Sequence, residues 1–210
     1  ALVGTVSPLL LTFLRWAIAV SAMAPFAWPL VRRHADLVRR HWRAIAWLGF
    51  WGTGLHNAFA YVGLQYTSAT NVSLNSAIPV LIILCGWAIH RDTIARTQAL
   101  GVAVSMAGVA AILSGGDAAA LARLTVNHGD LIVLVGMVFW AVYTVYLRQR
   151  PEGLPPLALL FCCGVVGVLL LAPLAAWEFA TGDGRLDVTP ASLAALAYVG
   201  IFPSFLGYVF

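Results

Sequence analysis

The sequence contains no lysine, and all 12 of its basic side chains are arginines. Charge is scarce throughout, because charged residues make up only 10% of the chain. An ordinary soluble domain has about 25%. From Ala44 to His90 there is no Asp, Glu, Lys or Arg. Since about 20 apolar residues are enough to cross a bilayer, this charge-free stretch predicts two membrane spans and a turn.

Cysteine is also scarce. Cys85, Cys162 and Cys163 fall inside apolar segments and have neither metal-ligand spacing nor a disulfide pattern. We interpret them as small apolar side chains and predict no metal, cofactor or catalytic residue. The net charge of +4 does not indicate nucleic acid, because the arginines lie between apolar segments, as topology determinants do.

What the sequence has in abundance is apolar residues, at 61% of the chain. A soluble fold of 210 residues could not bury that much apolar surface. An unpaired backbone amide is too costly in lipid, and the apolar segments are too long for the strands of a barrel. Each segment is therefore expected to be a helix. We therefore predict an all-α integral membrane protein with seven transmembrane helices, over residues 9–31, 44–64, 71–89, 95–114, 129–147, 156–177 and 191–210.

The arginines predict the orientation. Nine of them lie in the loops 32–43, 90–96 and 148–155, which follow the first, third and fifth segments. Only Arg123 and Arg185 lie in the loops of the opposite side. Positive charge accumulates in cytoplasmic loops, so these three loops are predicted to be cytoplasmic. The expected location is the cell (inner) membrane, as a multi-pass protein.

The chain also resembles itself. At a shift of 148 positions, residues 8–28 align with residues 156–176, and eight of the 21 pairs are identical, among them Pro25 with Pro173. At a shift of 151, Gly49 aligns with Gly200 and Gly52 with Pro203. Aligned prolines and glycines make a chance match of apolar residues a poor explanation, and they indicate an internal repeat.

The repeat predicts a unit of five helices, because the first segment matches the sixth and the second matches the seventh. An odd number of helices reverses the second copy, which gives the inverted-topology repeat of many secondary transporters. We expect a first repeat over 1–114, an external linker over 115–128 and a second repeat over 129–210. The first copy lacks one helix and the second lacks two, so the expected parent is a ten-helix bundle truncated at both ends.

Several short motifs occur in order along the chain. Ser7-Pro8 precedes Phe13-Leu14-Arg15, and the later motifs lie at residues 64–69, 75–79, 98–101, 108–109, 129–130 and 140–144. In these motifs the chain resembles the EamA-domain transporters of the drug/metabolite transporter superfamily over nearly its whole length. The resemblance implies export or exchange of small metabolites. One departure is the pair Arg91-Asp92, where the family often has Gly-Glu, so this turn is expected to differ in shape.

Polar residues inside the spans are the candidates for transport. His56 and Asn57 lie in the middle of the charge-free stretch, where they can form an interhelical hydrogen bond, line the substrate pathway or couple a proton. Arg15 is the one formal charge well inside a span. Its alternatives are snorkelling to the outer interface, an anion contact and an internal pair.

Two further helices supply pathway candidates. Asn75 and Pro79 share one face of the third segment, with Ser76 beside them, and Pro79 leaves the carbonyl of Asn75 without its helical donor. Trp140 and Tyr143 are one turn apart on the fifth segment, where they form a cavity wall or an ordinary packed face.

Candidate hinges come from the repeat, because matched helix interruptions point to a central site. They are the aligned pairs Gly52 with Pro203 and Pro25 with Pro173. The alternative is that these prolines merely bend their helices. The small residues Gly101, Ser105 and Gly108 form a stripe that predicts close helix packing.

The expected function is a permease that exports or exchanges small metabolites, amino-acid-like compounds or drugs by alternating access. The alternatives are an intramembrane enzyme and a non-transporting membrane scaffold or fragment. The expected partners are the lipid bilayer, a small-molecule substrate and a coupling proton or ion, but no nucleic acid. A homodimer is compatible with the sequence.

Overall fold

The computed structural model describes residues 5–66, 78–91, 93, 95–114, 128–182 and 184–207. Regular structure in these residues is helical, apart from an isolated bridge between Val6 and Leu186. The prediction of an all-α protein is confirmed.

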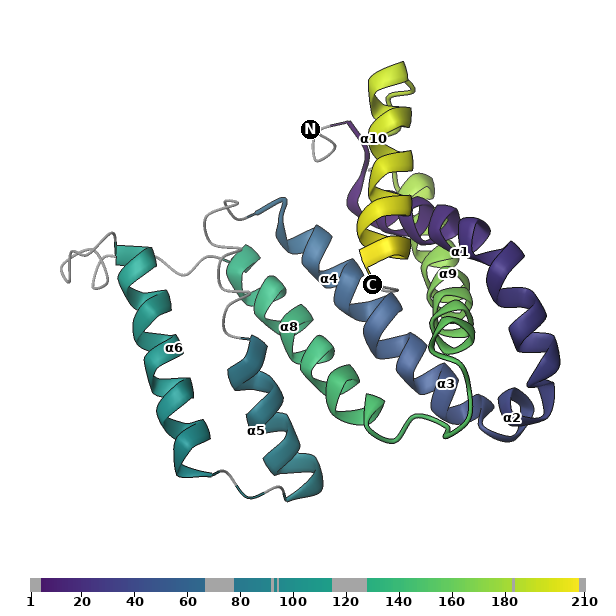
Figure 1. The fold of residues 1–210 in the computed structure, drawn as a ribbon. Helices are drawn as coiled ribbons and strands as arrows, with labels where there is room; N and C mark the ends of the chain where they lie inside the picture. Colours follow the sequence, from purple (N-terminus) through teal and green to yellow (C-terminus); the bar gives the residue numbers. More distant parts are fainter. Residues whose placement is uncertain are drawn as a thin grey trace.

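Within the described residues, each of the seven expected segments contains helix (Figure 1). The elements are α1 (Pro8–Arg33), α2 (Ala35–Arg40), α3 (Trp42–Leu48), η1 (Gly49–Leu55), α4 (His56–Gly63), α5 (Ile78–His90), α6 (Arg96–Ser114), α8 (His128–Leu147), α9 (Pro156–Ala180), α10 (Pro190–Ile201) and η3 (Phe202–Leu206). The second expected segment is the continuous run α3–η1–α4, and the seventh is α10–η3.

Three of the described helices are long and apolar enough to cross a membrane, namely α1, α8 and α9. The apolar helices α5 and α10–η3 are shorter. Proline is the first residue of α1, α9 and α10, where its fixed φ suits a helix start and its missing N–H costs nothing.

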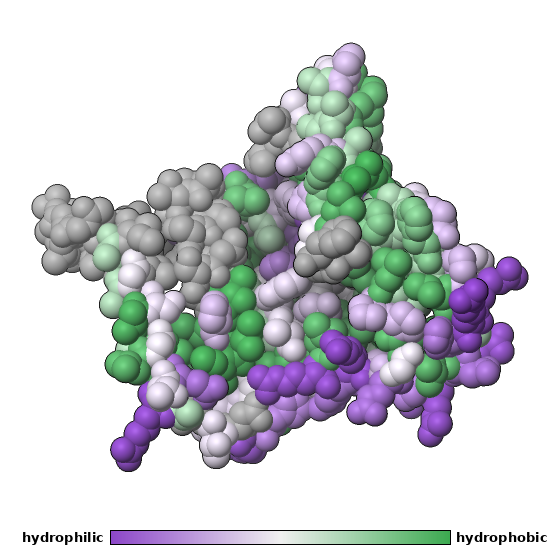
Figure 2. Space-filling view, in the orientation of Figure 1, coloured by the Kyte–Doolittle hydropathy of each residue, from purple (hydrophilic) through white to green (hydrophobic). Residues whose placement is uncertain are grey.

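The connections α1–α2–α3, α5–α6 and α8–α9 all lie at the lower end of the bundle in Figure 1. These are the connections that carry nine of the arginines. Figure 2 shows the same lower edge as hydrophilic, below a band of apolar surface. The arrangement gives the bundle an apolar band that suits lipid and one arginine-rich end; that this end is cytoplasmic stays a prediction.

The core lies between α1 and α9. Trp16, Ala19 and Met23 of α1 are fully buried and pack in one cluster with Phe161 and Leu171 of α9. The two helices bury equivalent faces. Of the nine buried residues on α1, eight have a buried residue 148 positions later on α9. The sequence repeat is therefore accompanied by a repeated packing pattern.

Helix α6 stands apart from this core, on the far side of α5 (Figure 1). Its apolar residues Leu100, Val104 and Met106 are exposed. A Cβ atom built on Gly101 or Gly108 would have nothing within 4 Å in the described part of the chain. The close packing expected for the small-residue stripe is thus not found among the described residues.

Candidate functional site

Two helices change to π-helical geometry, at η1 and η3. A shift of 151 positions carries residues 49–55 onto residues 200–206, so the two π-helical segments overlap. The aligned pair Gly52 and Pro203, predicted as hinges, lies inside them. Single π-turns within α-helices are rare and are frequent at functional sites, which makes the matched pair the starting point for the site.

Each of the two helices with a π-helical segment packs through a glycine on one of the two aligned helices, α9 or α1. A Cβ on Gly49 would lie 2.8 Å from the carbonyl oxygen of Cys163 and 2.7 Å from Cβ of Val166, both on α9. A Cβ on Gly200 would lie 3.2 Å from the carbonyl oxygen of Arg15 and 2.6 Å from Ile18, both on α1. Arg15 and Ile18 align with Cys163 and Val166, so the two contacts are equivalent.

A buried hydroxyl lies inside each π-helical segment. Oγ1 of Thr53 donates to the carbonyl oxygens of Gly49 at 2.8 Å and Cys163 at 2.6 Å, and the second bond joins η1 to α9. Oγ of Ser204 donates to the carbonyl oxygen of Val199 at 2.8 Å. Thr53 and Ser204 are aligned residues, and both satisfy carbonyls near the wider turn.

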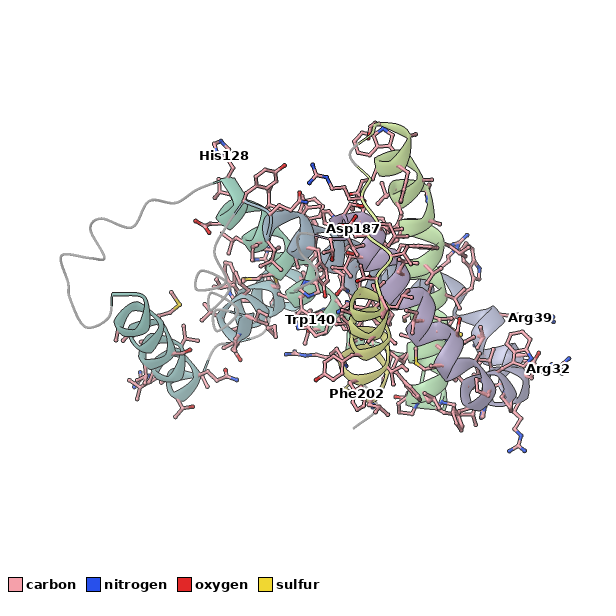
Figure 3. All side chains as sticks on the ribbon, turned by 90° about the horizontal axis from the view of Figure 1, so that it is seen from above. Arg32, Arg39, His128, Trp140, Asp187 and Phe202 are labelled. Atoms are coloured by element: carbon pink, nitrogen blue, oxygen red, sulfur yellow. The ribbon has the colours of Figure 1, made fainter. Side chains whose placement is uncertain are left out.

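A cavity of 570 Å³ lies close to both π-helical segments, because its wall residue Gly207 directly follows η3 and its wall residue Tyr143 contacts Gly52 of η1. Its walls come from α5, α8, α9 and the residue after η3; they are formed by Ile82, Trp140, Tyr143, Thr144, Leu147, Arg150, Pro156, Leu159, Leu160, Cys163 and Gly207. Trp140 and Tyr143 therefore both line it, with ring centroids 5.1 Å apart. Figure 3 shows Trp140 on the side of α8 that faces α10. The volume suits a small organic molecule.

Segment η1 packs against Tyr143, one of the residues of the cavity wall. A Cβ on Gly52 would lie 2.6–2.8 Å from three ring carbons of Tyr143, so only glycine fits at this place. A change in the shape of η1 would consequently move Tyr143, and with it the wall of the cavity.

His56 begins α4 directly after η1. Its Nδ1–H donates to the carbonyl oxygen of Gly136 on α8 at 2.8 Å, and its ring lies 4.9 Å from that of Trp140. Gly136 has no side chain to separate the helices, and a Cβ there would lie 3.2 Å from the carbonyl oxygen of His56. This geometry favours the interhelical hydrogen bond among the alternatives for His56.

Asn57 joins Arg15 to η1. Its Nδ2 donates to the carbonyl oxygens of Gly52 at 2.9 Å and Thr53 at 3.2 Å, and its Oδ1 accepts from Nη2 of Arg15. Both residues are buried. Among the three alternatives for Arg15, the structure thus shows an internal pair rather than a side chain that snorkels to the interface. Six of the predicted site residues therefore lie in or near η1 and the start of α4: Arg15, Gly52, His56, Asn57, Trp140 and Tyr143.

Other predicted residues lie elsewhere. Pro79, in the first turn of α5, is exposed, and α5 contributes Ile82 to the cavity instead. Asn75 and Ser76 lie outside the described residues. Pro25 and Pro173 are exposed inside helices that continue through them. Their hinge role stays a prediction. Where the structure describes the chain, no three His, Cys, Asp or Glu side chains are grouped as metal ligands.

Glu178 is a residue of the structure that the sequence reasoning missed. It is buried near the end of α9, and its Oε1 and Oε2 accept hydrogen bonds from the backbone N–H groups of Leu9 at 3.3 Å and Leu10 at 3.0 Å. A carboxylate suits the positive end of a helix dipole, so Glu178 caps α1 from another helix. It follows Ala175 by three residues and Leu171 by seven, and this spacing places it on the buried face of α9 and could have revealed it.

Apolar helices with an arginine-rich end, a cavity between them and two matched π-helical segments are the features of a helical membrane transporter. The comparison with known families agrees. The chain belongs to the EamA-like transporter family, whose model matches residues 1–114 and 127–210.

The relatives of the chain are transporters by name. It is 30% identical over 164 residues to the uncharacterized transporter YyaM of Bacillus subtilis, a match that covers 77% of this chain and 53% of YyaM. It is 30% identical over 212 residues to an uncharacterized transporter of Archaeoglobus fulgidus, covering 96% of this chain and 68% of that protein. The chain thus spans about half the length of YyaM. No solved structure gives a significant match.

Proposed function

We propose that the full-length transporter containing these residues exports or exchanges small organic metabolites, such as amino-acid-like compounds or drugs, across the cell (inner) membrane. It does so by alternating access, as two inverted five-helix repeats rock against each other, and an ion or proton gradient drives it. The family and the names of its relatives point to a transporter rather than an enzyme.

The observation that carries the proposal is the pair of π-helical segments at aligned positions. Each interrupts the third helix of its expected five-helix unit, and the cavity wall includes Tyr143, which contacts η1, and Gly207, which follows η3. Matched interruptions in inverted halves provide a central binding site and the two flexible elements that expose it in turn. In this proposal Trp140 and Tyr143 contact the substrate, and Gly52 and Pro203 absorb the change in backbone shape.

The test is flux in vesicles that contain the purified full-length transporter. We expect saturable counterflow of at least one labelled compound from a panel of amino acids, their analogues and cationic drugs. Dissipating the proton and sodium gradients should abolish its accumulation. If no compound gives saturable flux, the transport proposal is wrong. Turnover of a compound to a new chemical product would instead favour the intramembrane enzyme.

Two substitutions connect the flux to the site. Gly52→Leu places a side chain in the ring of Tyr143 and should reduce flux at least tenfold, about 1.4 kcal/mol on a rate. Gly101→Leu is the matched control, because a Cβ there has nothing within 4 Å among the described residues. Tyr143→Ala widens the cavity without introducing a clash and should raise the KM. Equal flux in the Gly52 and Gly101 variants, both monodisperse, would contradict the site.

A further inference from the structure

A five-residue motif occurs twice where α1 leads into α2. The run Leu30-Val31-Arg32-Arg33-His34 is repeated without a change at residues 37–41, seven positions later. With Arg43, residues 30–43 contain five arginines and a single acidic residue, Asp36. A topology signal requires positive charge, but it does not require two identical copies of one motif. The exact repetition therefore indicates a site with two equivalent halves.

Both copies of the motif end a helix in the same way. Each places its arginine pair in the last turn, of α1 or of α2, and its histidine directly after the helix. Nδ1–H of His34 donates to the carbonyl oxygen of Leu30 at 2.9 Å, and Nδ1–H of His41 donates to that of Leu37 at 3.0 Å. The backbone N–H of each histidine donates to the same carbonyl. The two copies are thus equivalent in structure as well as in sequence.

The motif divides its side chains between the core and the surface. Leu30, Val31 and Val38 pack against the buried cluster that contains Ile45 and Leu159. Figure 3 shows Arg32 and Arg39 at the same edge of the molecule, both directed away from it. The arginine corner, as we call the four arginines of the two copies, is exposed throughout: Arg32, Arg33, Arg39 and Arg40.

The arginine corner has little negative charge near it. Asp36 lies between the two copies and is exposed. The neighbouring loop approaches Leu37 through Gly153, and its acidic residue Glu152 is exposed as well. Among the described residues, no acidic side chain forms an ion pair with any arginine of the corner. Four guanidinium groups are therefore available to an anionic partner.

Two tryptophans indicate what kind of partner this is. Trp28 is 52% exposed, and the guanidinium carbon of Arg32 lies 5.9 Å from its ring centroid. Trp42 is 59% exposed, and that of Arg43 lies 5.5 Å from its ring centroid. Exposed tryptophan is typical of the boundary between the hydrocarbon and the headgroups of a bilayer. We therefore expect the arginine corner at the depth of the lipid phosphates.

We propose that the arginine corner binds an anionic phospholipid that carries two phosphates, as cardiolipin does, with one phosphate on each arginine pair. A guanidinium presents parallel N–H donors that match phosphate oxygens, and the two copies supply two such sets. A lipid with one phosphate engages one pair at a time. When two phosphates are linked, the second contact becomes intramolecular, which strengthens binding. The lipid site does not depend on the proposed transport function.

The test is native mass spectrometry of the full-length transporter in detergent, with one lipid added in increasing amounts. Cardiolipin should half-saturate its first site at a phosphate concentration about tenfold lower than phosphatidylglycerol does, because its phosphates are linked. Phosphatidylcholine should displace neither lipid. If cardiolipin and phosphatidylglycerol half-saturate the wild type at equal phosphate concentrations, the inference is overturned.

Two double variants locate the site. Changing the two arginines of either copy to glutamine should remove the tenfold advantage of cardiolipin, because only one phosphate is then held. The matched control is Arg91→Gln with Arg96→Gln, which removes the same charge from the α5–α6 connection at the same end of the bundle (Figure 1). The control should keep the advantage. An equal loss in the control would show that charge alone attracts the lipid and would contradict the site.

A further variant keeps the charge, in case loss of arginine disturbs insertion into the membrane. With all four arginines of the corner changed to lysine, the topology signal is retained but the parallel donors are lost. Half-saturation by cardiolipin should then need about threefold more lipid or above. Unchanged binding would overturn the assignment of a guanidinium pair to each phosphate. Displacement of cardiolipin by inorganic phosphate at the same phosphate concentration would overturn the assignment to a lipid.

Discussion

The two π-helical segments have the same backbone form in different surroundings. In η1 the residues Gly49, Gly52, Thr53 and Gly54 are buried against α8 and α9. In η3 only Ser204 is buried, while Phe202 is 52% exposed and Pro203 is exposed as well. The two segments therefore share π-helical geometry although neighbouring helices enclose only η1.

The difference shows two ways to obtain a wide helical turn. In η3 the cause is local, because Pro203 has no N–H for the carbonyl of Val199, and the hydroxyl of Ser204 takes its place. In η1 there is no proline, and the glycines let the segment approach α9 closely enough for Thr53 to bond Cys163. We infer that packing maintains η1 and that covalent structure maintains η3.

The largest expected effect is that of adding one methyl group to each aligned glycine. In Gly49→Ala the new Cβ lies 2.8 Å from a backbone carbonyl oxygen of α9, so η1 and α9 must move apart. This should lower the free energy of unfolding by about 2–3 kcal/mol. In Gly200→Ala the carbonyl is 3.2 Å away and the nearest atoms belong to the side chain of Ile18, so about 1 kcal/mol is expected. Thermal unfolding in detergent measures both.

The control for this pair is Gly101→Ala. Its Cβ meets nothing within 4 Å of the described chain, and alanine favours helix over glycine, so its unfolding midpoint should stay or rise slightly. Equal losses for Gly49→Ala and Gly200→Ala would show that the two segments depend on packing alike.

A smaller effect is expected from removing the hydroxyls. Thr53→Val keeps the shape of the side chain but breaks a hydrogen bond between helices, so it should cost about 1–1.5 kcal/mol. Ser204→Ala breaks a bond within one helix and should cost about 0.5 kcal/mol. Chemical unfolding of the two variants in the same detergent gives the comparison, and a larger loss for Ser204→Ala would reverse it.

The smallest effect is expected for Pro203→Ala. Its free energy of unfolding should lie within about 0.5 kcal/mol of the wild-type value, because the restored N–H replaces the hydrogen bond made by Ser204. The sharper measurement is a double-mutant cycle. In the Pro203→Ala background, Ser204→Ala should become neutral, since the carbonyl of Val199 then has a backbone partner. Strict additivity of the two substitutions would exclude a proline-based origin of η3.

The positions of the helices were predictable because charge, proline and glycine mark their ends. Wherever both ends are described, the expected bounds lie within a few residues of the observed ones. The different shape expected for the turn after α5 stays a prediction. Arg91 replaces the glycine that the family often has, yet its φ is 58°, in the left-handed region that favours glycine. Arg91 therefore has a backbone conformation that is typical of glycine.

The candidate site was predictable in its residues but not in its contacts. Polarity inside a span singled out Arg15, His56 and Asn57, and the repeat singled out Gly52. That Arg15 pairs with Asn57 depends on how α1 and α4 are rotated about their axes, which one amphipathic pattern does not determine. The partner of Glu178 is a pair of backbone amides, and no side-chain pattern in the sequence can reveal those.

The cap that Glu178 places on α1 has a mechanical consequence. It fixes the first turn of one long helix to the last turns of another, and the two helices belong to different repeats in the expected architecture. The joined ends can act as a fixed pivot point, the fulcrum about which α1 rotates. Because α1 has 26 residues, its other end lies about 39 Å away at 1.5 Å per residue. A rotation of about 10° about the fulcrum would displace that end by about 7 Å over this length. Small angular changes at the outer surface would therefore become large openings at the arginine-rich surface.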